Sequence, residues 1–276
     1  PNPVSFPPAG INAMNDNMIQ ALGDELYTAL RQGQALTPLT RRHDDITLDD
    51  AYRISLQILS RREADGEKVI GKKIGVTSKA VQDMLNVHQP DFGFLTDRMQ
   101  VADGSDVSLR EHRLIAPRAE GEIAFILRED LNGPGVTASD VLAATEWVVP
   151  CFEIVDSRIA NWEIRIEDTV ADNASCGVFA LGETRIDPRS LDLAAVELNM
   201  TLNGQPAGSG LGSAVQGHPC EAVAWLANTL GKLGIPFRRG EIILSGALAP
   251  LVPVGAGDHI EMHISGLGNA SLRFTD

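Results

Sequence analysis

The chain has 276 residues, of which 43% are hydrophobic, and its 37 acidic and 23 basic residues give a formal net charge of −14. A chain of this length buries a sizeable core, and its acidity argues against nucleic-acid backbones and anionic membrane surfaces as partners. No apolar run approaches the length of a membrane span, so we expect no membrane partner.

Helical patterns dominate the first hundred residues. Residues 1–14 are proline-rich and unpatterned, and we interpret them as a disordered leader or a remnant of expression. Asn15 or Asp16 is a typical cap for an amphipathic helix that Gly33 ends, and a second helix begins at Thr47. One short strand and a third helix follow. Residues 15–100 are therefore predicted to form a helical part packed on the core.

From residue 101 the sequence pattern changes to short runs rich in β-branched residues, separated by turn residues. This pattern predicts a β-rich catalytic core over 101–276. Asn203-Gly204 is typical of a hairpin turn, and two helices are expected, after Thr137 and after Pro219. The predicted strands are residues 120–127, 148–155, 177–181, 195–202, 241–245, 259–265 and 270–274. A helical part on a mainly antiparallel or mixed sheet indicates the α+β class.

Two carboxylates one residue apart are the most informative local feature. Glu120 and Glu122 lie in a strand-like run, so they point to the same face, and Ala124 and Ile126 continue that face as a buried one. Glu153 lies in a second apolar run. Buried like charges need compensation, which indicates a Mg²⁺ or Mn²⁺ site. The alternative is that these acids face solvent on edge strands.

The three cysteines, Cys151, Cys176 and Cys220, are widely spaced and form no Cys-x-x-Cys pair. This spacing argues against a zinc knuckle or a redox motif. We interpret them as buried free thiols in a reducing cytoplasm.

An ordered set of motifs covers nearly the whole chain, from Asn15 to Phe274. The motifs are residues 69–82, 89–93, 118–124, 152–158, 170–175, 217–219, 243–246 and 257–258. In this order they resemble the fumarylacetoacetate hydrolase superfamily and, within it, the 2-oxopent-4-enoate (2-hydroxypenta-2,4-dienoate) hydratase family. The resemblance implies a mixed β-sheet roll with an N-terminal helical part, and assembly into a homo-oligomer, with a decamer as one form.

The resemblance also assigns site residues. It carries the metal ligands to Glu120, Glu122 and Glu153, for Mg²⁺ or Mn²⁺. It makes Lys73 an active-site lysine near the carboxylate or oxo group of the substrate. Strand alternation places the neighbouring Lys72 on the opposite face, towards solvent. Without the resemblance, either lysine would be read as surface charge.

Asp91 follows Pro90, so we expect it on a constrained turn. The resemblance makes it an acid/base residue or the group that positions water, whereas the residues alone favour an ordinary Asx turn. The stretch from Gln89 to Gly93 resembles the hydratase form of the motif. The related 4-oxalocrotonate decarboxylases carry an apolar residue where Asp91 stands.

Four further residues are predicted to bind substrate. Ser245 and Gly246 end an apolar strand, where a hydroxyl and a backbone amide are available to a carboxylate. Asp172 and Ser175 lie in a motif that resembles the loop of the site. Structural capping is the alternative for these residues.

The resemblance implies hydration of 2-hydroxypenta-2,4-dienoate to 4-hydroxy-2-oxopentanoate, in the meta-cleavage degradation of aromatic compounds. The metal and Lys73 would stabilise negative charge on the substrate, and Asp91 would move a proton or orient water. One alternative is a metal-dependent decarboxylase of the 4-oxalocrotonate type. Another is a non-catalytic partner subunit. A complex with a 4-oxalocrotonate decarboxylase is also expected from the family.

Overall fold

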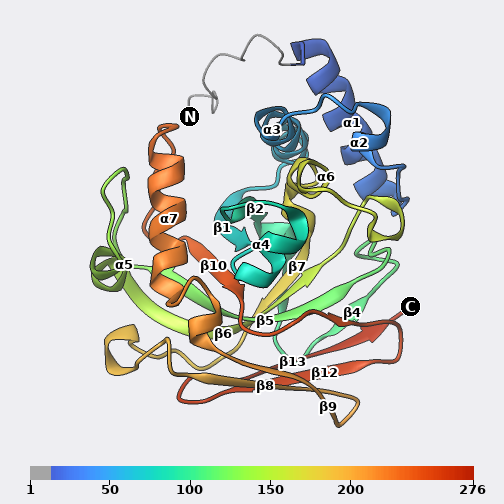
Figure 1. Ribbon diagram of the computed structural model, residues 1–276. Coiled ribbons are helices and arrows are strands. Elements are labelled where there is room, and N and C mark those ends of the chain that lie inside the picture. The colour runs from blue at the N-terminus through green and yellow to red at the C-terminus, as the bar shows by residue number, and fades with distance from the viewer. Residues whose placement is uncertain (1–13) are drawn as a thin grey trace.

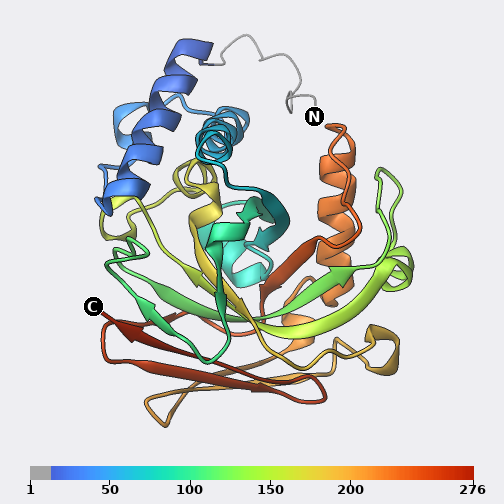
Figure 2. The same cartoon turned by 180° about the vertical axis from the view of Figure 1, so that it is seen from behind.

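The computed structural model describes residues 14–276 and contains two β-sheets in layers, with helices on the outer face of the larger sheet (Figures 1 and 2). The predicted leader, residues 1–14, lies outside the described residues except for Met14. None of the helices in residues 14–276 combines the length and the apolar character that crossing a bilayer requires.

The first part of the described chain is helical: α1 (Asp16–Gln32), α2 (Leu39–Arg42) and α3 (Leu48–Ala64). The capping predictions for the long helices are confirmed. The Asn15 side chain accepts a hydrogen bond from the Met18 amide, and Gly33 ends α1 with a left-handed φ of 63°. Thr47 and Asp50 form the reciprocal capping box of α3.

The larger sheet has eight strands and is mixed. Its order is β2-β1-β10-β5-β6-β7-β3, with β11 beside β5, and β1·β10 and β3·β7 are its parallel pairs. The strands are β1 (Val69–Gly75), β2 (Asp91–Thr96), β3 (Gln100–Ala102), β5 (Arg118–Leu127), β6 (Thr145–Val155), β7 (Cys176–Leu181), β10 (Ile242–Ala247) and β11 (Val252–Pro253). Residues 69–102 thus supply three strands to this sheet, so the expected boundary at residue 100 does not separate a helical part from a β core.

The smaller sheet packs on the outer face of the larger one, the face that Gly121 and Ile123 of β5 share. It contains β4 (Asp106–Ser108), β8 (Glu197–Leu202), β9 (Gln205–Leu211), β12 (His259–Ile264) and β13 (Gly268–Thr275), in the order β4-β13-β12-β8-β9. A Cβ atom on Gly121 of β5 would lie 2.4 Å from Leu198 Cδ1, so the two layers meet closely there. The predicted turn at Asn203-Gly204 joins β8 to β9, with φ values of 53° and 78°.

Shorter helices complete the fold: α4 (Lys79–Leu85), α5 (Ala138–Ala144), α6 (Ile166–Ala171) and α7 (Pro219–Gly231). The 3₁₀ turns are η1 (Asp97–Met99), η2 (Ala160–Trp162), η3 (Asn173–Ser175), η4 (Pro188–Ser190) and η5 (Gly212–Ala214). Helix α6 contacts α3, and α7 contacts β1 and β10. Figure 1 shows α7 on one flank of the molecule and α1 to α3 on the other.

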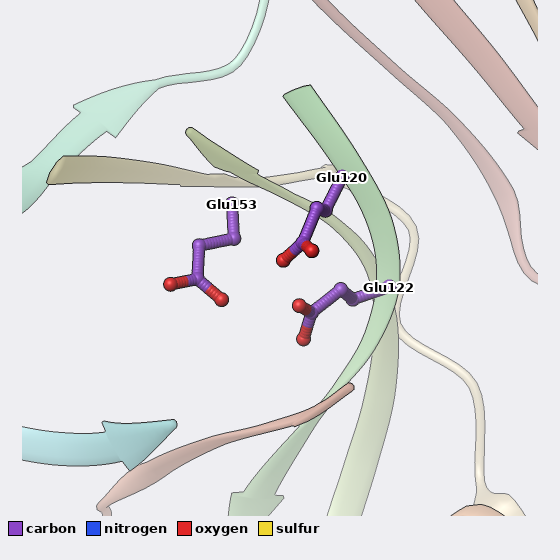
Figure 3. Close-up of side chains that lie close together, drawn as sticks. All are labelled: Glu120, Glu122 and Glu153. Atoms are coloured by element: carbon purple, nitrogen blue, oxygen red, sulfur yellow. The ribbon is translucent and has the colours of Figure 1, made fainter. Parts of the chain in front are cut away.

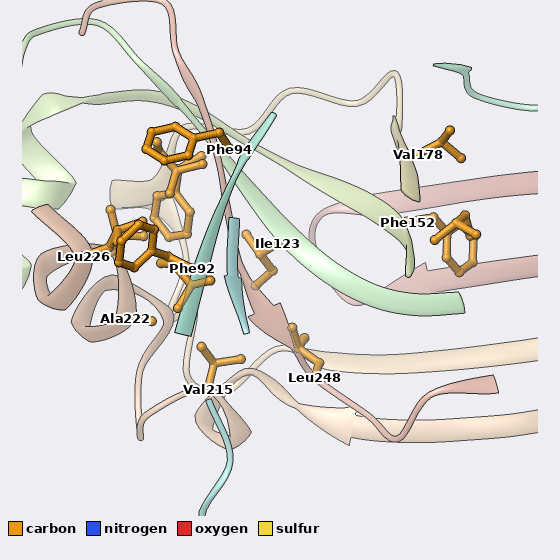
Figure 4. Close-up of a cluster of buried hydrophobic side chains, with 14 of the residues drawn as sticks. Phe92, Phe94, Ile123, Phe152, Val178, Val215, Ala222, Leu226 and Leu248 are labelled. Carbon is orange, nitrogen blue, oxygen red and sulfur yellow. The ribbon is translucent and has the colours of Figure 1, made fainter. Parts of the chain in front are cut away.

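Buried apolar side chains from both sheets and several helices form one main core (Figure 4). It includes Phe92 and Phe94 of β2, Ile123 of β5 and Leu226 of α7. The Phe92 ring also stacks on Tyr52 of α3, with centroids 4.3 Å apart, which ties the helical part to the edge of the sheet. A second, smaller apolar cluster includes Ala124 and lies on the opposite face of β5. The strands that carry the acidic residues are therefore held on both faces.

Candidate functional site

Glu120, Glu122 and Glu153 converge on one side of the larger sheet (Figure 3). One carboxylate oxygen from each lies within 4.8 Å of the other two. Glu120 is the cross-strand partner of Glu153 in the antiparallel pair β5·β6, and Glu122 follows on the same face of β5. Glu122 and Glu153 are fully buried, and Glu120 is partly exposed. The face that strand alternation predicted for the two acids of β5 is confirmed.

The carboxylates are poorly compensated by the protein itself. Burial, reinforced by the charge of Glu153, raises the pKa of Glu120 to about 7 and that of Glu122 well above its usual range. Glu122 Oε1 and both carboxylate oxygens of Glu153 are buried without a hydrogen-bond partner among residues 14–276. A set of unpartnered, hard oxygen donors suits Mg²⁺ or Mn²⁺ better than Zn²⁺, so the residues fit the predicted metal.

Lys73 lies at the edge of this acidic cluster. It is buried on β1, where its Nζ lies 3.1 Å from Glu153 Oε1 and donates a hydrogen bond to the carbonyl oxygen of Ala174 at 2.8 Å. Burial lowers the pKa of Lys73, but the carboxylates of Glu153 and Asp91 outweigh that effect and leave the pKa above its ordinary value. The side chain is therefore a charged ammonium group that faces the carboxylates.

Lys72 lies on the opposite face of β1, as alternation predicted, but the expectation that it faces solvent is wrong. Its side chain is 2% exposed and forms an ion pair with Glu241 at 2.6 Å. Its ammonium group also lies 5.1 Å from the ring centroid of Phe237. Helix α7 contacts β1, so this face of the sheet is covered.

Asp91 is the first residue of β2 rather than part of a turn. Its Oδ1 is buried without a hydrogen-bond partner among residues 14–276. A Cβ atom on Gly75 would lie 2.4 Å from that oxygen and 3.4 Å from Lys73 Nζ, so both groups line the space beside Gly75. Burial raises the pKa of Asp91, and the nearby charge of Lys73 opposes that rise.

The polar groups of Ser245 and Gly246 already form hydrogen bonds within the protein. The Ser245 hydroxyl donates to the Ile123 carbonyl oxygen at 2.7 Å, inside β10 rather than at its end. The Gly246 amide donates to Glu122 Oε2 at 3.0 Å. These contacts orient a glutamate of the cluster, and substrate contact by the two residues stays a prediction.

Asp172 immediately precedes the 3₁₀ turn η3, and Ser175 is its last residue. The Asp172 carboxylate accepts hydrogen bonds from the backbone amide and Nε of Arg158, in an ion pair of 2.7 Å. Burial raises the pKa of Asp172 to about 6, although Arg158 opposes the rise. The Ser175 hydroxyl pairs with that of Thr169 at 2.7 Å. Both side chains thus hold the turn, and their contact with substrate also stays a prediction.

Sequence reasoning missed two contributors to this site. The carbonyl oxygen of Ala174 binds Lys73, and the side chain of Asn173 holds the turn that presents this carbonyl. Every residue carries a backbone carbonyl, so residue identity does not indicate which carbonyl contacts Lys73. The role of Asn173 was also hidden, because its partner Phe94 lies 79 residues earlier in the chain. The one available sign was that Asn173 lies inside a motif of the resemblance.

Residues 67–275 match the family model described as fumarylacetoacetate (FAA) hydrolase C-terminal. A 2-hydroxyhexa-2,4-dienoate hydratase from Comamonas testosteroni is 68% identical over 94% of this chain and 98% of the relative. A 2-hydroxypent-2,4-dienoate hydratase from Pseudomonas putida is 60% identical over 80% of this chain and the whole of the relative.

Solved structures give the same overall picture. A 4-oxalocrotonate decarboxylase from Pseudomonas putida G7, complexed with magnesium and adipate, superposes with a TM-score of 0.91 at 35% identity, over 95% of this chain and 99% of the other. A fumarylpyruvate hydrolase from Pseudomonas aeruginosa, in complex with Mn²⁺ and pyruvate, has a TM-score of 0.61 at 12% identity over 74% of this chain and 88% of the other, a likeness of fold alone.

Proposed function

The chain belongs to the fumarylacetoacetate hydrolase family, and from this premise we propose that it is a metal-dependent hydratase of the meta-cleavage degradation of aromatic compounds. It adds water to 2-hydroxypenta-2,4-dienoate, the tautomer of 2-oxopent-4-enoate, and gives 4-hydroxy-2-oxopentanoate. The observation that carries the proposal is the convergence of three glutamates, two of them fully buried, beside Lys73 and Asp91. Relatives named as hydratases at 68% and 60% identity support it.

Glu120, Glu122 and Glu153 would hold the metal, for which we propose Mg²⁺ or Mn²⁺. When bound, the metal supplies a Lewis acid that polarises the 2-oxygen of the substrate. Two observations support this choice: the oxygen-only donor set, and the magnesium in the 4-oxalocrotonate decarboxylase that shares the fold.

Two residues of the chain act on protons and charge. The ammonium group of Lys73 stabilises negative charge that develops on the substrate, because it is buried and is held by its hydrogen bond to Ala174 and its ion pair with Glu153. Asp91 exchanges a proton with the substrate or orients the attacking water, since its Oδ1 is unpartnered and its pKa is raised by burial. Both residues lie on the first two strands, whereas the glutamates lie on β5 and β6.

The decarboxylase alternative has less support. The solved decarboxylase is 35% identical, whereas the two hydratases are 68% and 60% identical. Asp91 also stands where we expect an apolar residue in the decarboxylases. The non-catalytic alternative is disfavoured because the three glutamates and Lys73 are all present and converge.

Assembly and location are further parts of the proposal. We expect a homo-oligomer, with a decamer as one form, and a complex with a 4-oxalocrotonate decarboxylase, both from the family. The cytoplasm is the proposed location, because Cys151, Cys176 and Cys220 are free and buried.

The test follows the loss of dienoate absorbance in purified protein. It compares protein with Mg²⁺, protein after chelation, and chelated protein with metal restored. We expect turnover with metal, none after chelation, and recovery on restoration. The five-carbon and six-carbon dienoates are compared, because the relatives are named for both. Turnover that is indifferent to chelation, or decarboxylation of 4-oxalocrotonate in its place, would contradict the proposal.

A further inference from the structure

The turn η3 has an unusual backbone. Asn173, Ala174 and Ser175 follow one another with φ values of 53°, 49° and 56°. Asparagine tolerates this left-handed region, whereas alanine and serine are rare there, because their Cβ atoms crowd the backbone. Three such residues in a row persist only where surrounding contacts hold them.

Asn173 provides the contacts on one side of the turn. Its side-chain Oδ1 accepts a hydrogen bond from the Phe94 amide at 2.9 Å, and its Nδ2 donates to the Phe94 carbonyl oxygen at 3.0 Å. The amide group thus pairs with the edge strand β2 as a neighbouring strand would. Gly93 permits this approach, since a Cβ atom there would lie 2.6 Å from the Asn173 carbonyl oxygen.

The position of the turn determines what Lys73 contacts. Lys73 is the cross-strand partner of Gly93, one residue from the Phe94 anchor. The next residue of the turn, Ala174, accepts the hydrogen bond from Lys73 Nζ at 2.8 Å. The ammonium group therefore lies between this carbonyl and Glu153 Oε1, which is 3.1 Å away.

From these contacts we infer that Asn173 is a positioning residue, which clamps η3 to Phe94 so that the Ala174 carbonyl aims Lys73 at the reacting substrate. The inference rests on the proposed role of Lys73 in hydration. Loss of the clamp frees the left-handed turn to relax. Lys73 then loses its hydrogen bond to the Ala174 carbonyl oxygen and keeps its ion pair with Glu153.

The decisive variant is Asn173→Gly. Glycine adopts the φ of 53° without strain, so the substitution removes the side-chain amide and leaves the backbone conformation accessible. Asn203→Gly is a matched control. Asn203 also has a φ of 53°, and its amide donates to Asp258 and accepts from the His259 amide, in the β8–β9 turn.

We expect Asn173→Gly to lower kcat by about 10- to 100-fold, with KM and Mg²⁺ affinity close to those of the wild type. Asn203→Gly should keep the wild-type kcat while losing a similar amount of thermal stability. Wild-type kcat in Asn173→Gly would overturn the inference. Parallel losses of kcat and stability in both variants would also overturn it, because the role would then be merely structural.

A crystal structure of Asn173→Gly separates this inference from the proposed function. We expect Lys73 Nζ to lie beyond hydrogen-bond distance of the Ala174 carbonyl oxygen. An unchanged contact would overturn the inference whatever the reaction proves to be, whereas absence of hydration in the wild type would overturn the proposed function alone. If Asn173→Gly does not fold, Asn173→Asp, which keeps an acceptor for the Phe94 amide, is measured in the same way.

Discussion

Glu122 shows most clearly that ionising the carboxyl groups of the site is energetically unfavourable. Its carboxylate is fully buried, and one oxygen accepts from the Gly246 amide while the other has no partner among residues 14–276. Glu153 and Glu120 add repulsion to the desolvation of this group. Residues selected for stability alone would not be arranged in this way, because buried charges without partners destabilise a fold. The arrangement therefore supports the proposal that a cation binds there.

The substitution Glu122→Gln separates stability from metal binding. We expect the metal-free variant to be more stable than the wild type by about 1–3 kcal/mol at neutral pH, because folding the wild type must either bury a charged Glu122 or protonate it, and glutamine requires neither. The same variant should lose at least about tenfold in Mg²⁺ affinity, since an amide is a weaker ligand than a carboxylate. Denaturant unfolding without metal and calorimetric titration with Mg²⁺ measure the two effects.

Glu261→Gln is the control for this pair of effects, because Glu261 lies on β12 with its side chain 50% exposed. Neither its stability nor its metal affinity should change appreciably. A metal-free Glu122→Gln that is less stable than the wild type would contradict the view that Glu122 is under electrostatic strain.

Asp91→Asn tests the second proposed catalytic residue. The amide has nearly the same shape but cannot exchange a proton, so we expect kcat to fall by about 10²- to 10⁴-fold. Mg²⁺ affinity should stay close to that of the wild type, because Asp91 is not one of the three converging glutamates proposed to hold the metal. Steady-state kinetics and a metal titration check both statements. Hydration at nearly the wild-type rate would remove Asp91 from the mechanism.

The junction of α1, α3 and β2 depends on one buried carboxylate. Glu67 accepts a hydrogen bond from Arg31 of α1 at 2.6 Å and one from Arg62 of α3 at 2.8 Å. The Thr96 hydroxyl of β2 also donates to it. Burial raises the pKa of Glu67, but the hydrogen bonds from Arg31 and Thr96 and the charge of Arg62 outweigh that effect and leave the pKa below its ordinary value. This contact keeps the helices packed against the strand that begins with Asp91.

Glu67→Gln should lower the free energy of unfolding by about 2–4 kcal/mol at neutral pH, because it leaves a buried arginine without its partner. The stabilisation by Glu67 is present above the ordinary pKa of 4.5 and is lost as the pH falls through the lowered folded value. The difference between variant and wild type should therefore shrink below about pH 4. Urea unfolding at several pH values measures it.

Glu163→Gln is the matched control for the junction. Glu163 pairs with Arg41, but the two side chains are 44% and 63% exposed. Exposed pairs contribute about 0–1 kcal/mol, so the control should unfold almost as the wild type does. A stability difference for Glu67→Gln that does not change with pH would rule out the proposed ionic origin.

The sequence predicted those features that depend on residues close together in the chain, such as helix caps. The caps at Asn15, Thr47 and Thr137 were readable because each bonds to an amide three residues later. Strand β2 was missed, since a proline precedes it, an aspartate begins it and a glycine interrupts it. The short strands β3, β4 and β11 are set by pairing with distant strands and carry too little periodicity to be predicted.

The candidate site, like the fold, could be predicted from the sequence only in part. Strand alternation placed Glu120 and Glu122 on one face, but their meeting with Glu153 depends on register, which sequence alone did not fix. Lys73 and Asp91 were predicted by resemblance rather than by their own chemistry. The error at Lys72 has a clear origin, because its buried partner Glu241 lies 169 residues away.

At the scale of the whole molecule, the acidic cluster couples pH, metal and stability. Because burial raises the pKa of Glu120 to about 7, the folded protein holds a proton there more tightly than the unfolded chain does. Without metal, this group therefore costs stability as the pH rises from its ordinary pKa of 4.5 through 7. Binding of the proposed metal would offset this cost and would have to displace the proton at lower pH.

Calorimetric titration of the metal-free protein with Mg²⁺ at about pH 6 and pH 8 tests the central claim most directly. The account predicts one Mg²⁺ per chain at both pH values, with weaker binding and proton release at the lower pH. It also predicts that Glu153→Gln abolishes this binding. Absence of saturable Mg²⁺ binding, or an affinity that neither pH nor Glu153→Gln changes, would contradict the claim.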